Sequence, residues 1–364
     1  KIDGGKLTLV KNVPVTYTGA KTAVPDMNGT ACPDLVYPNY QDWGYAKVKL
    51  DKRSFATART SLAKVDDPLL RAMLWQSLWD GVRDAEMPLN DFITVALNNA
   101  PLEKDYTLLG DVLGKVSESK AYLDAMNLDN AYTRQTTLAL EKMAWDGVLA
   151  NKGNADFQRR WFNQYVSVAS SPDALTRLAG ILGGQVDAAG VPVGQPQRWS
   201  IIARLNRYNY PGAFDLIAQE SARDKSDAGQ IAAVAATVIR PDAAVKADWV
   251  KQIEDQKTAL PFSRIRTAMG SIFPAEQGAL NERDADARLA RLPQVDKTGG
   301  PVFMRAYAGT MIPATCTPQS VARLTRAAAT MTDLSAFTRR TLLDTLQDDQ
   351  RCVAIKAKLS APKG

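Results

Sequence analysis

Apolar residues recur at the spacing of an α-helix along most of the chain after residue 51. One such run starts at Ser171-Pro172 and ends at the glycine pair 183–184. Between these limits, four apolar residues fall at positions i, i+3, i+4 and i+7, namely Leu175, Leu178, Ala179 and Leu182. This spacing places the four side chains on one face of a helix. A capping oxygen followed by proline is a typical helix start, and glycine is a typical helix end.

The same start signal occurs at Asp67-Pro68 and at Thr317-Pro318. Segment 231–239 is apolar almost all round and stops before Pro241, which predicts a helix buried between its neighbours. About a dozen or more helices can be placed by such patterns, joined by short polar turns. A row of helix pairs that cannot bury their apolar faces alone predicts a mainly α fold, an irregular α-solenoid of the HEAT or armadillo kind. The longest break, residues 183–197, predicts a loop or hinge between two halves of the array.

The first 51 residues follow a different pattern. Segments 6–10 and 13–17 are alternating or β-branched, and residues 45–50 alternate apolar side chains with lysines, so each predicts a strand. So few strands form at best a marginal unit. We therefore expect residues 1–51 to be a partial β-sandwich segment, a β remnant in front of an α-helical repeat domain over residues 52–364.

Composition and charge exclude several classes of protein. With 45% apolar and 23% charged residues, the 364-residue chain has the profile of a soluble globular protein. Its longest apolar stretch, residues 231–239, is far shorter than the ~20 residues of a membrane-spanning helix. The net charge of +6 is spread along the chain without a basic cluster. Neither a membrane span nor a nucleic-acid partner is therefore expected.

The absence of histidine restricts the chemistry of this chain. A Ser-His-Asp or Cys-His mechanism requires an imidazole, and catalytic zinc sites are normally built on at least one histidine. The glycine-rich phosphate-binding motifs are also absent. Carboxylate, lysine or tyrosine chemistry stays possible in principle, but no convincing carboxylate pair for an independent hydrolase stands out. We expect no catalytic residue, no metal site and no cofactor in this chain.

The three cysteines suggest one disulfide. Cys316 and Cys352 are 36 positions apart near the end of the chain, whereas Cys32 stands alone. A bridge between the first two would stabilise the fold by about 4 kcal/mol; the alternative is two buried free thiols. A bridge also favours the periplasm over the cytoplasm, although the sequence does not establish the compartment.

Three arginines are candidates for contact with a substrate. Arg83, Arg198 and Arg264 lie beside aromatic or apolar helix faces. A guanidinium on such a face could bind a peptide carboxylate through paired hydrogen bonds. The alternative for each is an ordinary ion pair between helices.

Two long segments carry a resemblance to a known family. Residues 35–51 (LVYPNYQDWGYAKVKLD) and 67–84 (DPLLRAMLWQSLWDGVRD) resemble the C-terminal half of aminopeptidase N-type zinc peptidases. Further similarities lie at residues 197–199, 241–246 and 313–316. The resemblance implies the end of a β-sandwich followed by a bowl-shaped, ERAP-like helical domain.

The resemblance also implies a function. The zinc, the His-Glu-x-x-His helix and the Gly-x-Met-Glu-Asn strand of that family would belong to a catalytic domain that this sequence does not contain. We therefore expect a non-catalytic domain that controls which peptides reach the zinc of its own enzyme. Its partners would be peptide substrates and the enzyme's own catalytic domain. The alternative is a free-standing α-solenoid that binds other proteins.

Overall fold

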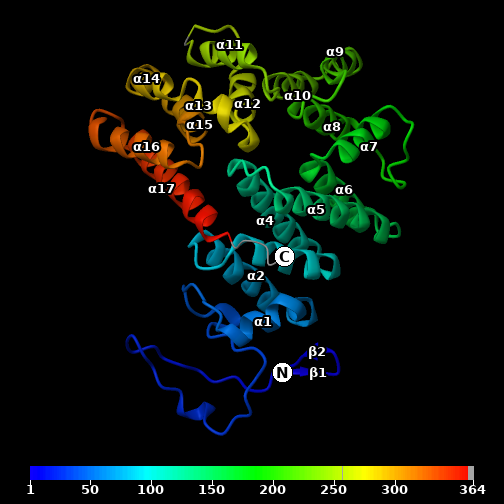
Figure 1. The fold of residues 1–364 in the computed structure, drawn as a ribbon, viewed down its shortest axis with the longest axis vertical. Coiled ribbons are helices and arrows are strands. Elements are labelled where there is room, and N and C mark those ends of the chain that lie inside the picture. Colours follow the sequence, from blue (N-terminus) through cyan, green and yellow to red (C-terminus); the bar gives the residue numbers. More distant parts are fainter. Residues whose placement is uncertain (256, 360–364) are drawn as a thin grey trace. The chain divides into compact units, whose positions relative to one another are not determined.

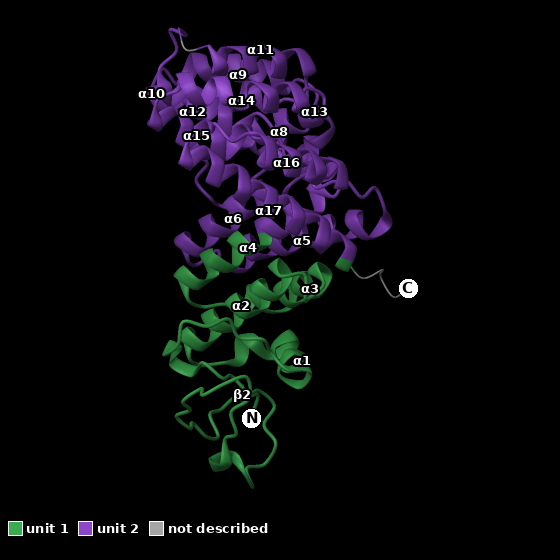
Figure 2. Cartoon of the chain, turned by 90° about the vertical axis from the view of Figure 1, so that its left-hand side faces the viewer, with its two compact units in different colours: residues 1–116, 358–360 green, residues 117–357, 361–364 purple. Residues whose placement is uncertain are grey.

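The computed structural model describes residues 1–255 and 257–359, and these residues form two compact units. Unit 1 comprises residues 1–116 and the described residues after 357, and unit 2 comprises residues 117–357 (Figure 2). The division falls inside helix α4, not at residue 51 and not in segment 183–197. Within the described ranges the chain has seventeen α-helices and one two-stranded sheet (Figure 1). The mainly α fold predicted from the sequence is confirmed.

Unit 1 consists of a short hairpin, irregular segments and helices. The elements in chain order are β1 (Ile2–Asp3), β2 (Lys6–Leu7), η1 (Pro25–Met27), η2 (Tyr40–Asp42), α1 (Lys52–Ser61), η3 (Leu62–Lys64), α2 (Pro68–Arg83), α3 (Leu89–Asn99), η4 (Ala100–Leu102) and the first part of α4 (Tyr106–Ala125). The Asp67 carboxylate caps α2 by accepting a hydrogen bond from the backbone N–H of Leu69 at 2.9 Å. Buried Trp75 and Trp79 of α2 pack against Phe92 of α3, with ring centres 6.0 and 4.9 Å apart.

The prediction of strands in the first 51 residues is largely wrong. Ile2 pairs with Leu7 and Asp3 with Lys6, and Leu7 also forms an isolated parallel bridge with Val65. Segments 13–17 and 45–50 are not strands. Alternating side chains make a strand only where a neighbouring backbone supplies hydrogen bonds. In this segment Tyr17 and Tyr45 are exposed rather than packed on a second sheet.

Unit 2 is a succession of helices. They are α5 (Ala131–Ala150), α6 (Ala155–Val168), α7 (Pro172–Leu182), α8 (Gln195–Arg207), α9 (Ala213–Arg223), α10 (Asp227–Val238), α11 (Ala243–Glu254), α12 (Phe262–Ser271), η5 (Ala275–Gln277), α13 (Gly278–Glu282), α14 (Ala285–Thr298), α15 (Pro301–Met311), α16 (Pro318–Thr330) and α17 (Ala336–Lys358). Helices α6, α8, α10, α12 and α15 contact one another in that order, while α7, α9 and α11 pack beside them. This two-layer arrangement of successive helix pairs is that of an α-solenoid.

The helix starts found in the sequence are confirmed. Ser171 and Thr317 cap α7 and α16 by accepting hydrogen bonds from the backbone N–H groups of Ala174 and Ser320, at 3.2 and 3.1 Å. The helix expected at 231–239 is also present, as part of α10. It is less buried than expected: of its apolar side chains only Ala236 and Val238 are fully buried. Ala232, Ala233 and Ala235 of α10 are half-buried, and burying an alanine side chain stabilises the fold less than burying a leucine.

The segment between α7 and α8 is a loop inside unit 2. The side chain of Gln158 on α6 donates a hydrogen bond to the backbone oxygen of Ala189 at 2.9 Å, and Val191 is buried. These contacts tie the loop to the helices beside it.

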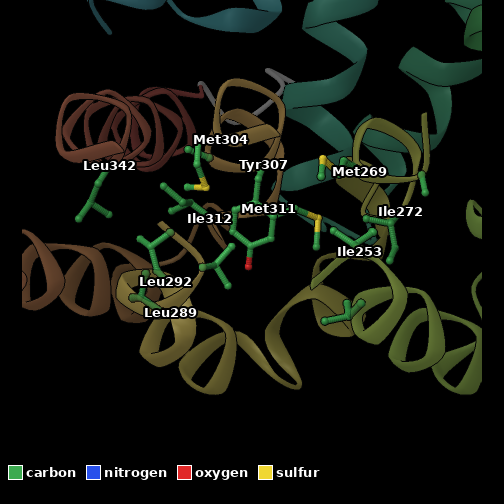
Figure 3. Close-up of a cluster of buried hydrophobic side chains, with 14 of the residues drawn as sticks. Ile253, Met269, Ile272, Leu289, Leu292, Met304, Tyr307, Met311, Ile312 and Leu342 are labelled. Carbon is green, nitrogen blue, oxygen red and sulfur yellow. The ribbon is translucent and has the colours of Figure 1, made fainter. Parts of the chain in front are cut away.

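An apolar cluster lies in the second half of unit 2. Figure 3 shows Leu289 and Leu292 of α14, Met304, Tyr307 and Met311 of α15, and Leu342 of α17 converging in one core. At the end of α17, the Lys356 ammonium donates a hydrogen bond to the backbone oxygen of Met126, in the turn after α4, at 3.0 Å. The last helix of unit 2 thus returns to the beginning of that unit.

Candidate functional site

Arg198 is engaged in an ion pair between helices. On α8, its Nε and Nη2 atoms donate to the two carboxylate oxygens of Glu220 on α9, at 2.9 and 2.6 Å. Its Nη1 atom donates to the backbone oxygen of Leu182 at the end of α7, at 3.2 Å. Hydrogen bonds from Arg198, more than any other contact, hold the pKa of the Glu220 carboxyl below its usual range. Arg198 therefore joins three helices.

Arg264 and Arg83 have different surroundings. Arg264 is half-buried on α12; its Nη2 atom donates to the side-chain oxygen of Gln230 on α10, while its buried Nε has no partner among the described residues. Arg83 is an exposed residue at the end of α2. Arg198 and Arg264 lie in unit 2 and share no partner in the described residues, and Arg83 lies in unit 1. The three candidates are thus not shown to form one site.

The structure joins Cys316 and Cys352 by a disulfide, with their Cα atoms 5.3 Å apart. It fastens the turn between α15 and α16 to helix α17. The backbone N–H of Cys316 also donates to the carboxylate of Asp349 on α17, at 2.6 Å. Burial raises the pKa of that carboxyl above its usual value. Cys32 is an exposed free cysteine whose sulfur accepts a hydrogen bond from Arg53 at 2.9 Å.

A second group of charged side chains, which the sequence analysis missed, gathers in unit 2. We call it the α8 polar cluster; its members are Lys120, Asp124, Arg204, Arg207, Tyr208, Lys246, Glu276 and Gln277. Two of its ion pairs are close: the Lys120 Nζ lies 2.5 Å from Asp124, and Arg207 donates twice to Glu276, at 2.6 and 2.5 Å. Electrostatic interactions link Tyr208 to Arg204, Glu276, Asp124 and Arg207. The cluster therefore brings together α4, α8, α11 and η5.

Burial changes the acidity of several groups in the α8 polar cluster. It raises the pKa of Tyr208 to about 12 and lowers the pKa of Lys246 to about 7. It also raises the pKa of Asp124, against the opposing effect of the Lys120 ammonium. Gln277 is buried and donates to the backbone oxygens of Arg207 and Ile239, at 3.2 and 2.8 Å.

Comparisons with known proteins connect this architecture to a family. A family model described as "ERAP1-like C-terminal domain" matches residues 35–351. The chain belongs to this family. It is also similar to Aminopeptidase N of Streptomyces lividans, with 32% identity over 262 residues, which cover 70% of this chain and 30% of that protein. The chain thus matches less than a third of the relative's length.

The potential metal ligands of this ERAP1-like domain are dispersed among the described residues. The sequence has no histidine, two of its three cysteines form the disulfide, and the third is exposed. Among residues 1–255 and 257–359, no three Asp, Glu or Cys side chains are grouped so that they could hold a metal ion. The described helices also include none that is both long and apolar enough to span a membrane.

One local signal in the sequence could have indicated the α8 polar cluster of this domain. Arg204, Arg207 and Tyr208 stand at positions i, i+3 and i+4, which places them on one face of a helix. Their partner Glu276 is 69 positions from Arg207, and no local pattern connects the two.

Proposed function

We propose that this chain is the non-catalytic, C-terminal helical part of a zinc aminopeptidase, and that it controls which peptides reach an active site carried by another part of the same enzyme. The observation that carries this proposal is the match of residues 35–351 to the ERAP1-like C-terminal domain, together with the similarity to a protein named Aminopeptidase N. The lack of histidine supports a division in which the zinc ligands lie outside this chain. Peptides and the enzyme's own catalytic domain are then its partners.

Several contacts hold the helices of unit 2 together, and such an array of helices is suited to this role. Helices α7, α8 and α9 are joined through Arg198 and Glu220, and α17 is fastened by the disulfide and by Asp349. An array of helices held together in this way can exclude long or folded peptide chains from a reaction site and limit the access of water to it. The zinc would supply hydrolysis from its own domain.

The three candidate arginines do not fit this role equally. Arg83 is exposed and Arg264 is half-buried, so we propose these two as contacts for longer peptides. Arg198 already donates to Glu220 and Leu182, so we propose that it holds helices α7, α8 and α9 together.

Substitution in the full-length enzyme tests the proposal. Arg83→Ala and Arg264→Ala are expected to raise the KM for longer peptides more than the KM for a dipeptide analogue, because only the longer chains reach these side chains. Arg59→Ala is the matched control, since Arg59 is another exposed arginine of unit 1, in the last turn of α1. Equal effects on short and long substrates would contradict a gating role.

A free-standing α-solenoid that binds other proteins is the alternative function. The full-length gene product distinguishes the two. The enzyme requires several hundred further residues that include a His-Glu-x-x-His motif, whereas a free-standing module does not.

A further inference from the structure

Two consecutive turns lie at residues 25–30 of unit 1, and the first of them is η1. In the second, the backbone N–H of Thr30 donates to the backbone oxygen of Met27, at 3.2 Å. Asn28 has φ −62° and ψ 138°, and Gly29 has φ +75°, as in a type II turn, which requires a positive φ at its third residue. Asn28 and Gly29 are both exposed. The fold thus presents an asparagine–glycine pair at the surface.

The fold places little restraint on the side chain of Asn28. Its amide forms no hydrogen bond with a described residue, and the backbone N–H of Gly29 donates to none. A methyl group added at Gly29 would meet nothing within 4 Å. The second turn is closed by the one bond between Thr30 and Met27, and a single exposed hydrogen bond is a weak restraint. Breaking that bond is therefore enough to let the Gly29 nitrogen approach the Asn28 side chain.

The Asn28-Gly29 pair has the residue types that favour an intramolecular reaction of asparagine. The backbone nitrogen of the following residue can attack the side-chain carbonyl carbon, Cγ, and close a five-membered ring. A side chain on the following residue hinders this attack, and glycine has none. Of the asparagines in the sequence, only Asn28 is followed by glycine. Asparagine is among the thermolabile residues that heat-stable proteins use sparingly.

We propose that Asn28 is a site of spontaneous deamidation in the folded chain, through a succinimide that it forms with Gly29. The Gly29 nitrogen loses its proton to hydroxide and forms a bond to Cγ of Asn28. The bond from Cγ to Nδ2 breaks, and ammonia leaves with a proton taken from water. Water then opens the ring: addition at Cγ gives aspartate, and addition at the backbone carbonyl carbon gives isoaspartate, in which the main chain runs through Cβ.

The reaction changes both the charge and the backbone of this turn. Each product carries a carboxylate where the amide was, so each event makes the net charge of +6 less positive by one charge. The ERAP1-like match begins at residue 35, so the site lies outside the matched residues. The modification therefore does not depend on the gating role proposed above.

Incubation of the whole chain beside a free peptide of residues 25–31 (PDMNGTA) tests the site. Both would be kept in the same mildly alkaline buffer at physiological temperature, and tandem mass spectrometry of proteolytic fragments would follow the mass at Asn28. We expect a gain of about one dalton, because ammonia leaves and water enters. The rate in the chain should be within about tenfold of the rate in the peptide, because one exposed hydrogen bond opposes ring closure. Part of the product should be isoaspartate.

Asn12 is the internal control, because it is exposed in the same unit and is followed by Val13, whose branched side chain hinders the attack. Its mass should stay unchanged while Asn28 reacts. Gly29→Ala should slow the reaction by roughly tenfold or more, and Asn28→Gln should abolish it over the same period, since glutamine would have to close a six-membered ring. A rate in the chain more than about tenfold below that of the peptide would overturn the proposal, because the fold would then protect Asn28. A product without isoaspartate, or a rate that Gly29→Ala leaves unchanged, would also overturn it, because the reaction would then not pass through the ring with Gly29.

Discussion

Replacing Arg198 with methionine tests whether this side chain stabilises the fold or contacts a substrate. Glu220 is only 2% exposed in its side chain, and its carboxylate accepts two hydrogen bonds from Arg198 and one from Gln195, at 2.8 Å. Arg198→Met leaves a buried carboxylate with the single bond from Gln195. Removing one partner of a buried pair costs about 3–5 kcal/mol. Because the Gln195 bond stays, we expect a loss near the lower end, about 3 kcal/mol.

A double-mutant cycle separates the pair from the single side chains. Glu220→Gln removes the charge and keeps an acceptor for the partly exposed Arg198, so we expect a smaller loss of about 1–2 kcal/mol. The double variant Arg198→Met/Glu220→Gln should lose less than the sum of the two, with a coupling energy of about 1–3 kcal/mol. Urea unfolding followed by circular dichroism measures each free energy of unfolding.

The same pair predicts a pH dependence. The pKa of Glu220 is lower in the folded chain than in the unfolded chain, chiefly because of hydrogen bonds from Arg198. The resulting stabilisation is therefore complete above the unfolded pKa of about 4.3 and is lost as the pH falls through the lower folded pKa. Arg198→Met should remove this part of the acid dependence. A stability within about 0.5 kcal/mol of wild type at neutral pH would refute the structural role of Arg198.

Three further predictions concern other parts of the chain. Gly147→Ala should destabilise the chain by about 2–4 kcal/mol in urea unfolding, because the added carbon would lie 2.2 Å from the buried ring of Trp161. Gly114→Ala is the control: there is open space around Gly114, so this variant should raise the free energy of unfolding by up to about 1 kcal/mol. Lys246→Met should be more stable than wild type at pH 7. The wild-type free energy of unfolding should rise from pH 7 towards pH 10, by up to about 1.4 kcal/mol per pH unit, because the folded pKa of about 7 lies below the unfolded value; a flat profile would contradict a buried amine. Reduction of the disulfide should raise the mass by about two daltons in mass spectrometry, and an unchanged mass would show that the two thiols are free. Loss of the disulfide should lower the free energy of unfolding by about 4 kcal/mol.

The helical part of the fold was predictable because its signals are local. A capping residue and a following proline at Asp67-Pro68, Ser171-Pro172 and Thr317-Pro318 fix helix starts within one turn of sequence. The strands at 13–17 and 45–50 were wrong because an alternating pattern is also compatible with an extended segment that has no paired neighbour. Pairing depends on distant backbone, which the pattern does not contain.

The candidate site was less predictable, because it depends on contacts between distant residues. Nothing near Arg198 in the sequence indicates that its guanidinium will form an ion pair with Glu220, 22 positions later. The pair of Arg207 and Glu276 is equally hidden, since 69 positions separate the two residues. Residue type and helical spacing could indicate where arginines cluster, but not which carboxylate each of them contacts.

The zinc content and peptidase activity of the purified chain test the central claim most directly. The full-length enzyme, assayed beside it on an aminoacyl-anilide, serves as the positive control. The account predicts that the chain alone binds no stoichiometric zinc and hydrolyses no substrate, while the full-length enzyme does both. Metal-dependent turnover by the chain alone would contradict the account.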